Sequence, residues 1–396
     1  MIGTRQEKLD STGLKKPSLV LVSPGPKYDP IGFYQSRLET LTDGYEGVVL
    51  TSSPTPLRSE IGGFQIIAKR FHAGKLREFI SFLVACTRLS QELAQTGRKV
   101  DLVVSYDPLK SGILALFLKR QLGAKFAVEI NGIYDDPANY ADTRNRLIAR
   151  LKCQLYKGVE AFVIRRADGI KLLFDGQVDS FLEPGATKSV IRSFANLVNV
   201  VPFLSCPADI TKKRVLFVGY PHFLKGVDIL IAAFSILFEE FPEWELTILG
   251  WYPDKRVIER ALRGTRNITY PLPVPADKMP TQMASHSIFV LPSRAEAMGR
   301  VLIEAMGAGV ARIGARQGGI PTVIEDGVDG LLFEKNNVLE LASCLRILMG
   351  SEELRKSYGD AARERVTIDF SREKYLESIN NFYGDVITAD DGRSTE

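Results

Sequence analysis

Short apolar runs alternate with stretches of helical length along this sequence, and the alternation forms two series. Helical patterns at 76–94 and 111–122 separate the apolar runs of the first series. The expected strands of that series are 19–22, 47–51, 100–105, 125–130 and 168–174. Strands that alternate with helices favour a parallel sheet covered on both faces. We therefore expect the first half of the chain to form a Rossmann-like domain.

The alternation pauses after residue 196 and then resumes. Residues 197–213 carry Pro202, Pro207 and little periodicity, which is typical of a linker. Strands are expected again at 214–219, 244–250 and 287–292, with helices near 226–240 and 255–263. Tandem domains of this kind bind ligands at the carboxyl ends of their strands. The expected fold is α/β, with two Rossmann-like doubly wound domains facing across a cleft.

The length of 396 residues suits two domains of ordinary size. The expected parts are a disordered tail (1–16), an N-terminal acceptor domain (17–196), the linker (197–213), a C-terminal donor domain (214–370), an amphipathic helix (371–388) and a second disordered tail (389–396).

The composition excludes several classes of protein. The polar start lacks the apolar stretch of a secretory signal, and the longest apolar run, 229–238, is too short to span a bilayer. The four cysteines lie far apart without paired spacing, which argues against a metal site or a disulfide framework. We expect a cytoplasmic protein without a metal ion, another cofactor or a nucleic-acid partner.

Charge is divided unevenly between the halves. Residues 1–196 contain 28 Lys and Arg against 20 Asp and Glu, whereas the remainder carries a net negative charge. In an expected helix from about 143 to 157, we place Leu147, Ile148, Leu151 and Leu155 in the core and Arg146, Arg150 and Lys157 outward. The basic face predicts that the protein contacts the inner face of an anionic membrane. A solvated helix face is the simpler alternative.

The most informative stretch is 292–309, where a strand is followed by a short polar loop and a helix that begins near Gly299. Free N–H groups at a helix start favour a diphosphate, and glycine permits close approach. Glu304 lies about 7.5 Å further along the helix axis, within reach of a ribose beyond the phosphates. Glu296 precedes the helix and would face a transferred sugar. Alternatively, Glu296 complements the helix dipole and Glu304 is solvated.

Lys225 lies in the loop after the first strand of the same expected domain, where its charge would neutralise a diphosphate. Together with the Gly318-Gly319 loop and the gap between Glu296 and Glu304, this pattern resembles the retaining glycosyltransferases of family 4, a group 1 family with the GT-B fold. The resemblance is strongest over 214–350 and looser in the N-terminal half.

That resemblance implies roles for several residues. Glu296 would contact the donor sugar, Glu304 the ribose, and Lys225 the diphosphate. The remaining donor site would comprise Gly219, Tyr220, His222 and the main chain of Met298, Gly299 and Arg300. The acceptor side would include Gly32, Asp107 and Asn131. Main-chain N–H groups and lysine would supply the charge stabilisation, so no metal is required.

Two positions depart from the family pattern. Tyr220 stands where relatives carry an arginine, a loss that His222 or Arg300 would compensate or that weakens catalysis. Asn131 stands near the place of a histidine beside the acceptor, and an amide is a poor base. The predicted function is transfer of a sugar from a UDP- or GDP-sugar to a glycan or lipid-linked acceptor in surface polysaccharide biosynthesis. The alternatives are an inactive nucleotide-sugar-binding scaffold and a sugar-nucleotide epimerase of the same fold.

Overall fold

A computed structural model describes residues 15–25, 27–134, 136–137, 146–179, 188–251 and 255–389. The chain divides into two compact units. The first comprises Met1–Gly132, Gln154–Phe194 and Tyr375–Glu396, and the second comprises Ile133–Cys153 and Ala195–Lys374. Most of the two expected tails, 1–14 and 390–396, lies outside the described residues.

Eight strands form one sheet within the described part of the first unit, in the order β3-β4-β2-β1-β5-β6-β7-β8. Neighbours are parallel except for the antiparallel pair β3 and β4. The strands are β1 (Ser18–Val22), β2 (Glu46–Ser53), β3 (Leu57–Ile61), β4 (Phe64–Arg70), β5 (Leu102–Ser105), β6 (Lys125–Glu129), β7 (Gly169–Leu172) and β8 (Val190–Ser193). The order reverses between β1 and β5, which makes this the topological switch point.

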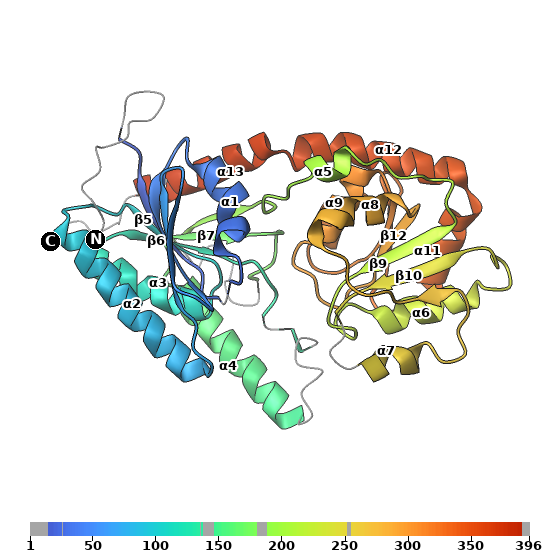
Figure 1. Ribbon diagram of the computed structural model, residues 1–396, viewed down its shortest axis with the longest axis horizontal. Coiled ribbons are helices and arrows are strands. Elements are labelled where there is room, and N and C mark those ends of the chain that lie inside the picture. The colour runs from blue at the N-terminus through green and yellow to red at the C-terminus, as the bar shows by residue number, and fades with distance from the viewer. Residues whose placement is uncertain are drawn as a thin grey trace. The chain divides into compact units, whose positions relative to one another are not determined.

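Helices cover both faces of that sheet (Figure 1). On one face lie α1 (Pro30–Leu41) and α13 (Arg372–Thr388). On the other lie α2 (Lys75–Gln95), α3 (Lys110–Leu122) and, from Gln154 onward, α4 (Arg146–Ile164). The final helix is anchored to this unit by a buried network. The Tyr383 hydroxyl donates to Glu129 at 2.8 Å, and the Arg37 guanidinium contacts both groups.

The described strands of the second unit form a six-stranded parallel sheet in the order β11-β10-β9-β12-β13-β14. This is the doubly wound order, with its switch point between β9 and β12. The strands are β9 (Arg214–Val218), β10 (Glu245–Leu249), β11 (Ile268–Thr269), β12 (Ile288–Leu291), β13 (Ala311–Ala315) and β14 (Leu331–Phe333). Strands β12 and β13 are buried along their whole length, as expected of a sheet covered on both faces.

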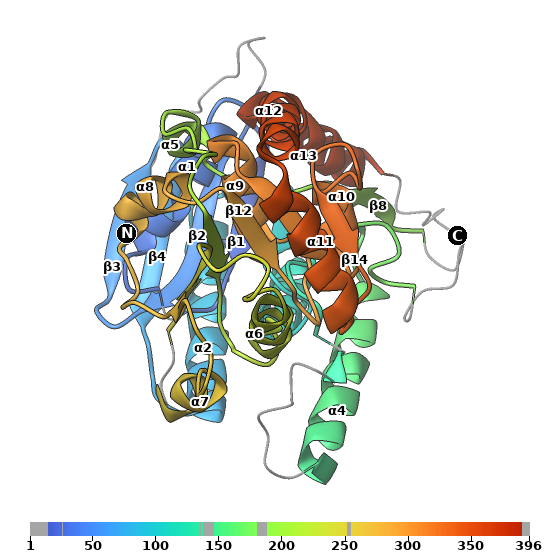
Figure 2. The ribbon, with the colours of Figure 1, turned by 90° about the vertical axis from the view of Figure 1, so that its right-hand side faces the viewer.

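The helices of the second unit also pack in two layers (Figure 2). One layer contains α6 (Val227–Ile236), α7 (Lys255–Ala261) and α11 (Val338–Gly350). The other contains α8 (Met279–Ala284), α9 (Arg300–Ala308) and α12 (Glu352–Asp369). Two further short helices are α5 (Val201–Leu204) and α10 (Ile320–Val323). The predicted α/β class with two parallel-sheet domains is therefore confirmed.

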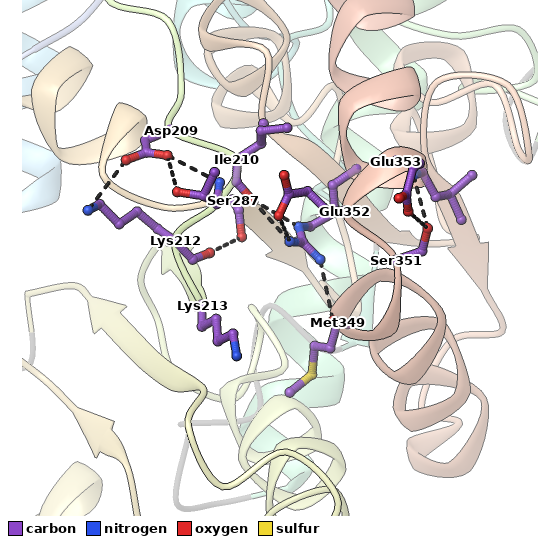
Figure 3. A network of polar contacts seen from close by, with 12 residues as sticks. Asp209, Ile210, Lys212, Lys213, Ser287, Met349, Ser351, Glu352 and Glu353 are labelled. Atoms are coloured by element: carbon purple, nitrogen blue, oxygen red, sulfur yellow. Dashed lines mark hydrogen bonds and ion pairs between the residues drawn. The ribbon is translucent and has the colours of Figure 1, made fainter.

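The segment 197–213, expected to be a linker, contains α5, which packs on α9. A polar network fixes its end to the second unit (Figure 3). The Ser287 hydroxyl donates to the Lys212 carbonyl, and the Arg355 side chain donates to the Ile210 carbonyl at 3.1 Å. This segment is thus packed against the second unit, and the expected domain bounds remain predictions.

The prediction for the basic helix is wrong about its apolar face. Leu147, Leu151 and Leu155 on α4 are between 61% and 65% exposed instead of lying in the core. The core contacts of α4 come from other positions, including Cys153 and Val163. The periodicity marked a helix correctly but could not show which face meets the sheet. Among the described helices, none is both long enough and apolar enough to cross a membrane.

Candidate functional site

The predicted donor residues lie at the switch point of the second sheet. The loop after β9 carries Gly219, Tyr220, His222 and Lys225, and the loop after β12 carries Glu296, Met298 and Gly299. Carboxyl ends of adjacent parallel strands meet at one edge of a sheet, so the two loops are neighbours. Residues of the two loops are about 70 positions apart in sequence, and the pairing of β9 with β12 brings them together.

A close ion pair joins the two loops. The Lys225 ammonium donates to a Glu296 carboxylate oxygen at 2.6 Å, and both side chains are largely buried. Ser293 lies within 3.5 Å of the same oxygen. Gly219 lies close to the Lys225 side chain. A Cβ atom at position 219 would lie 3.4 Å from the Lys225 Cγ atom. The structure therefore brings together the two predicted catalytic residues.

A second pair, which the sequence interpretation missed, locks the same loops. The Arg294 guanidinium makes two hydrogen bonds to the Asp228 carboxylate, at 2.8 and 2.7 Å. Arg294 also donates to the Phe223 carbonyl and lies 4.0 Å from the Phe223 ring centroid. Burial raises the pKa of Asp228, but the hydrogen bonds and charge of Arg294 outweigh it and hold that pKa below its ordinary value. Arg294 thus fixes the loop that carries Lys225.

Glycines allow the loop backbones to touch. A Cβ on Gly226, which has a φ of 68°, would lie 2.0 Å from the Pro292 carbonyl oxygen. Cβ atoms on Gly318 and Gly319 would lie equally close to the carbonyl oxygens of Glu296 and Ala297. No side chain fits at such distances. The predicted glycine loop therefore supports the loop of Glu296 from a third strand end.

Helix α9 begins where the sequence predicts. Gly299 is its N-cap residue, with a φ of 76°, and Arg300 is the first helical residue. The Met298 side chain is buried, and its sulfur accepts a hydrogen bond from the Asn196 N–H at 3.3 Å. The N-terminal end of α9 carries the partial positive charge of the helix dipole. It can attract an anionic group beside Lys225.

Glu304 lies on the second turn of α9 and is 8% exposed. The Arg300 side chain, itself 68% exposed, donates to the Glu304 carboxylate at 2.9 Å. Burial raises the pKa of Glu304, and the Arg300 charge offsets this in part. The predicted ribose acceptor is therefore largely desolvated, and it is already hydrogen-bonded to Arg300, which was expected to bind phosphate.

Tyr220 and His222 lie in the same loop, after Gly219. Tyr220 is 41% exposed and packs edge-to-face against Trp251, with ring centroids 5.5 Å apart. The His222 carbonyl accepts the Val227 N–H at 3.2 Å, at the start of α6. Both residues thus lie beside Lys225 in sequence and in the loop, while their predicted contacts with a donor remain predictions.

The predicted acceptor residues lie at the corresponding edge of the first sheet. Gly32 belongs to the first turn of α1, and its N–H donates to the Asp29 carboxylate at 3.0 Å. The Asp107 carboxylate accepts the Leu109 N–H at 2.8 Å, and burial raises its pKa. The Asn131 amide donates to the Tyr106 carbonyl at 2.8 Å.

A cation that the sequence interpretation missed lies at this edge. The Lys27 ammonium is 3.7 Å from the Phe33 ring centroid and 5.6 Å from that of Tyr106. Burial lowers its pKa, and the Asp107 charge offsets this. Lys27, Tyr106 and Asp107 therefore form one polar cluster beyond β1 and β5. Nothing in the sequence spacing, 79 positions from Lys27 to Tyr106, signals that contact.

Possible metal ligands do not cluster in the described part of the chain: no group of three His, Cys, Asp or Glu residues could hold an ion there. The four cysteines are unbridged. A chelator experiment, described below, tests whether activity requires a metal.

Comparison with known proteins bears on the second unit most directly. Residues 207–365 match the family model described as glycosyl transferases group 1. The match is confined to this region of the chain, which is similar to that family. The glycosyl transferase region contains every residue of the predicted donor site. It also contains the Arg294–Asp228 pair.

Among curated relatives, a sulfoquinovosyl transferase of Arabidopsis thaliana is 32% identical over 156 residues, which are 39% of this chain and 30% of the relative. The matches span between 30% and 64% of the length of the first curated relatives. They therefore compare parts of these proteins.

Solved structures share the fold across both units. A sucrose-phosphate synthase from Thermosynechococcus elongatus superposes with a TM-score of 0.76 at 19% identity, covering 95% of this chain and all of that one. Anabaena HepE in complex with UDP-glucose superposes with a TM-score of 0.70 at 14% identity, covering 93% and 99%. The fold is GT-B, as predicted.

Proposed function

We propose that this chain is a retaining, metal-independent glycosyltransferase. Its donor is a UDP- or GDP-sugar held by the second unit, and its acceptor is a glycan or a lipid-linked glycan of surface polysaccharide biosynthesis. The observation that carries the proposal is the Lys225–Glu296 ion pair beside the start of α9, at the switch point of a group 1 glycosyl transferase region. Relatives and structural neighbours that include a sulfoquinovosyl transferase and a UDP-glucose complex support it.

In the proposed reaction, the bond between the anomeric carbon and the diphosphate oxygen breaks. The acceptor oxygen bonds to the same face of that carbon, and its proton passes to the departing phosphate oxygen. Lys225 and the N–H groups at the start of α9 stabilise the charge that develops on the diphosphate. Glu296 accepts hydrogen bonds from donor sugar hydroxyls, and Lys225 holds its carboxylate beside the phosphate position.

The nucleoside is proposed to bind along α9. Glu304 accepts hydrogen bonds from the ribose hydroxyls, which requires Arg300 to share or release this carboxylate. Released from Glu304, the exposed Arg300 side chain is free to turn toward the diphosphate, in place of the arginine that relatives carry at position 220. Tyr220 and His222 complete this side of the donor site.

A panel of nucleotide-sugars, assayed with excess chelator, tests the proposal. We expect one donor to release its nucleoside diphosphate, faster with a suitable glycan acceptor than without. The Lys225→Ala variant should release the nucleoside diphosphate much more slowly. An epimerase would change the sugar and return an intact nucleotide-sugar, whereas a scaffold would bind without release. Either result, or dependence on a divalent metal, would contradict the proposal.

A further inference from the structure

Helix α4 exposes a continuous apolar stripe. Among its described side chains, Leu147 is 65% exposed, Leu151 61%, Leu155 63% and Phe162 47%. Their spacing of four, four and seven residues places them on one face of the helix. Ile148, 46% exposed, widens the same face. Leaving several large apolar side chains in water is costly, and contiguous patches of this kind mark interaction surfaces.

Cations border the stripe on both sides. At about 100° per residue, Arg150 lies to one side of Leu151 and Lys152 to the other, and both are exposed. Lys157 follows Arg150 by seven residues and shares its side. The Arg166 guanidinium lies 3.7 Å from the Phe162 ring centroid, just beyond the end of the helix.

Helix α4 contributes no exposed acidic side chain among its described residues. Glu160 is the single acid in the described span 146–166, and it is 2% exposed. An exposed apolar stripe with basic borders and no exposed acid is the pattern of a helix that lies in a membrane interface. The first 196 residues, with 28 Lys and Arg against 20 Asp and Glu, are basic as well.

We propose that α4 docks this protein on a membrane that contains anionic lipids. Leu147, Leu151, Leu155 and Phe162 enter the boundary between headgroups and acyl chains, and Arg150, Lys152 and Lys157 contact lipid phosphates. This differs from docking by a basic face alone, because the apolar side chains contribute directly. It does not depend on the proposed sugar transfer.

A second copy of the chain fits this surface less well. In a two-fold symmetric contact, a stripe pairs with its own copy, so the basic borders of both helices would lie together. Like charges at an interface oppose association. An anionic bilayer instead offers an apolar layer and complementary charge to the whole length of the helix.

Vesicle sedimentation of the full chain tests the proposal, with vesicles of phosphatidylglycerol and phosphatidylcholine or of phosphatidylcholine alone. We expect binding to the anionic vesicles, reduced but not abolished by high salt. The Leu151→Glu/Leu155→Glu variant should bind at least tenfold more weakly. Neutralising Arg150→Gln and Lys152→Gln should cost roughly fivefold per charge at low salt. The matched control is Leu339→Glu on α11, where a similarly exposed leucine (70%) lies outside the stripe.

Depth measurement distinguishes insertion from surface attraction. Tryptophan introduced as Leu155→Trp should be quenched by brominated acyl chains, whereas Leu339→Trp should not. Absence of vesicle binding, binding unchanged by the leucine substitutions, or binding without quenching would overturn the proposal. So would a dimer in sedimentation velocity that Leu151→Glu/Leu155→Glu converts to a monomer, because the stripe would then be a contact between copies.

Discussion

Arg300 and Glu304 are bonded across one turn of α9, with the guanidinium 2.9 Å from the carboxylate. The arginine is exposed and the glutamate is buried. The positive charge of Arg300 therefore lies beside a carboxylate that has little water around it. A ligand hydroxyl that bonds to Glu304 must compete with Arg300 or share its partner. The pair thus links the nucleoside end of the proposed donor site to its phosphate end.

Stability should change when the charge of Glu304 is removed. Burial raises its folded-state pKa above the unfolded value, so the folded protein binds more protons in that window and stability falls as pH rises through it. We expect Glu304→Gln to have a higher Tm than the natural protein at neutral pH and an equal Tm at acid pH, where Glu304 of the natural protein is protonated. Thermal unfolding at a series of pH values measures this. A lower Tm at neutral pH would show that the Arg300 pair outweighs burial.

Glu296 and Lys225 should differ in their effects on kinetics. Glu296→Gln should lower kcat by about 10²-fold or more and leave nucleoside diphosphate affinity nearly unchanged, because its proposed contacts are with the sugar. Lys225→Ala should lower kcat and also weaken nucleoside diphosphate affinity, because the charge of Lys225 acts on the diphosphate. Steady-state kinetics with the donor from the panel, together with nucleotide titrations, separate the two. Equal effects of both substitutions would argue against separate roles.

Arg294 should act by positioning. Arg294→Lys keeps the charge but loses the paired hydrogen bonds to Asp228, so the loop of Lys225 should be held less well. We expect roughly a tenfold loss of kcat at little cost in Tm, with Asp228→Asn similar and the double variant no worse than either. Arg346→Lys is the control, since its ion pair with Glu240 is exposed and distant in sequence. Full activity of Arg294→Lys would remove the positioning role.

Tyr383 should contribute to the stability of the first unit. Its hydroxyl donates to the fully buried Glu129 at 2.8 Å, and loss of a hydrogen bond to a charged group costs about 1.5–3 kcal/mol. Tyr383→Phe should lower the free energy of unfolding by that amount in urea unfolding followed in the first unit. Tyr28→Phe, at an 86% exposed site, should leave the free energy of unfolding unchanged. No loss in Tyr383→Phe would mean that Arg37 alone satisfies Glu129.

The same network predicts a dependence on pH. Burial raises the pKa of Glu129, but the charges of Arg37 and Lys171 outweigh it and lower that pKa. A folded-state pKa below the unfolded value means that stability is present above the unfolded pKa and is lost as pH falls through the folded pKa. Glu129→Gln should remove the part of the stability loss at acid pH that comes from protonation of Glu129. An unchanged pH profile would show that other carboxylates dominate.

The sheet strands were predictable because both faces of a parallel sheet are buried. Strands such as β9 and β12 are continuous apolar runs that stand out from amphipathic helices. The β3–β4 hairpin was missed because β3 alternates between exposed and half-buried residues at the sheet edge. Fully buried charges such as Arg312, which pairs with Asp329 at 2.8 Å, also escape periodicity, because composition marks them as surface residues.

The helix start in the candidate site was predictable because its residues are close in sequence. Gly299, Arg300 and Glu304 follow from the start of one helix, whereas the Arg294–Asp228 pair joins residues 66 positions apart. The apolar stripe of α4 shows the converse limit. Its 3.6-residue period identifies a helix, but the same period describes a face that packs on a sheet and a face left open, so exposure required the fold.

Titration calorimetry with UDP and with GDP, in excess chelator, tests the central claim that the second unit holds a nucleotide-sugar without metal. The account predicts that one nucleotide binds with one site per chain. Glu304→Ala should bind it about 1.5–3 kcal/mol more weakly, which is roughly ten- to 150-fold in Kd. Leu339→Glu should bind like the natural protein. Unchanged affinity in Glu304→Ala, or binding of either nucleotide only after metal is restored, would contradict the account.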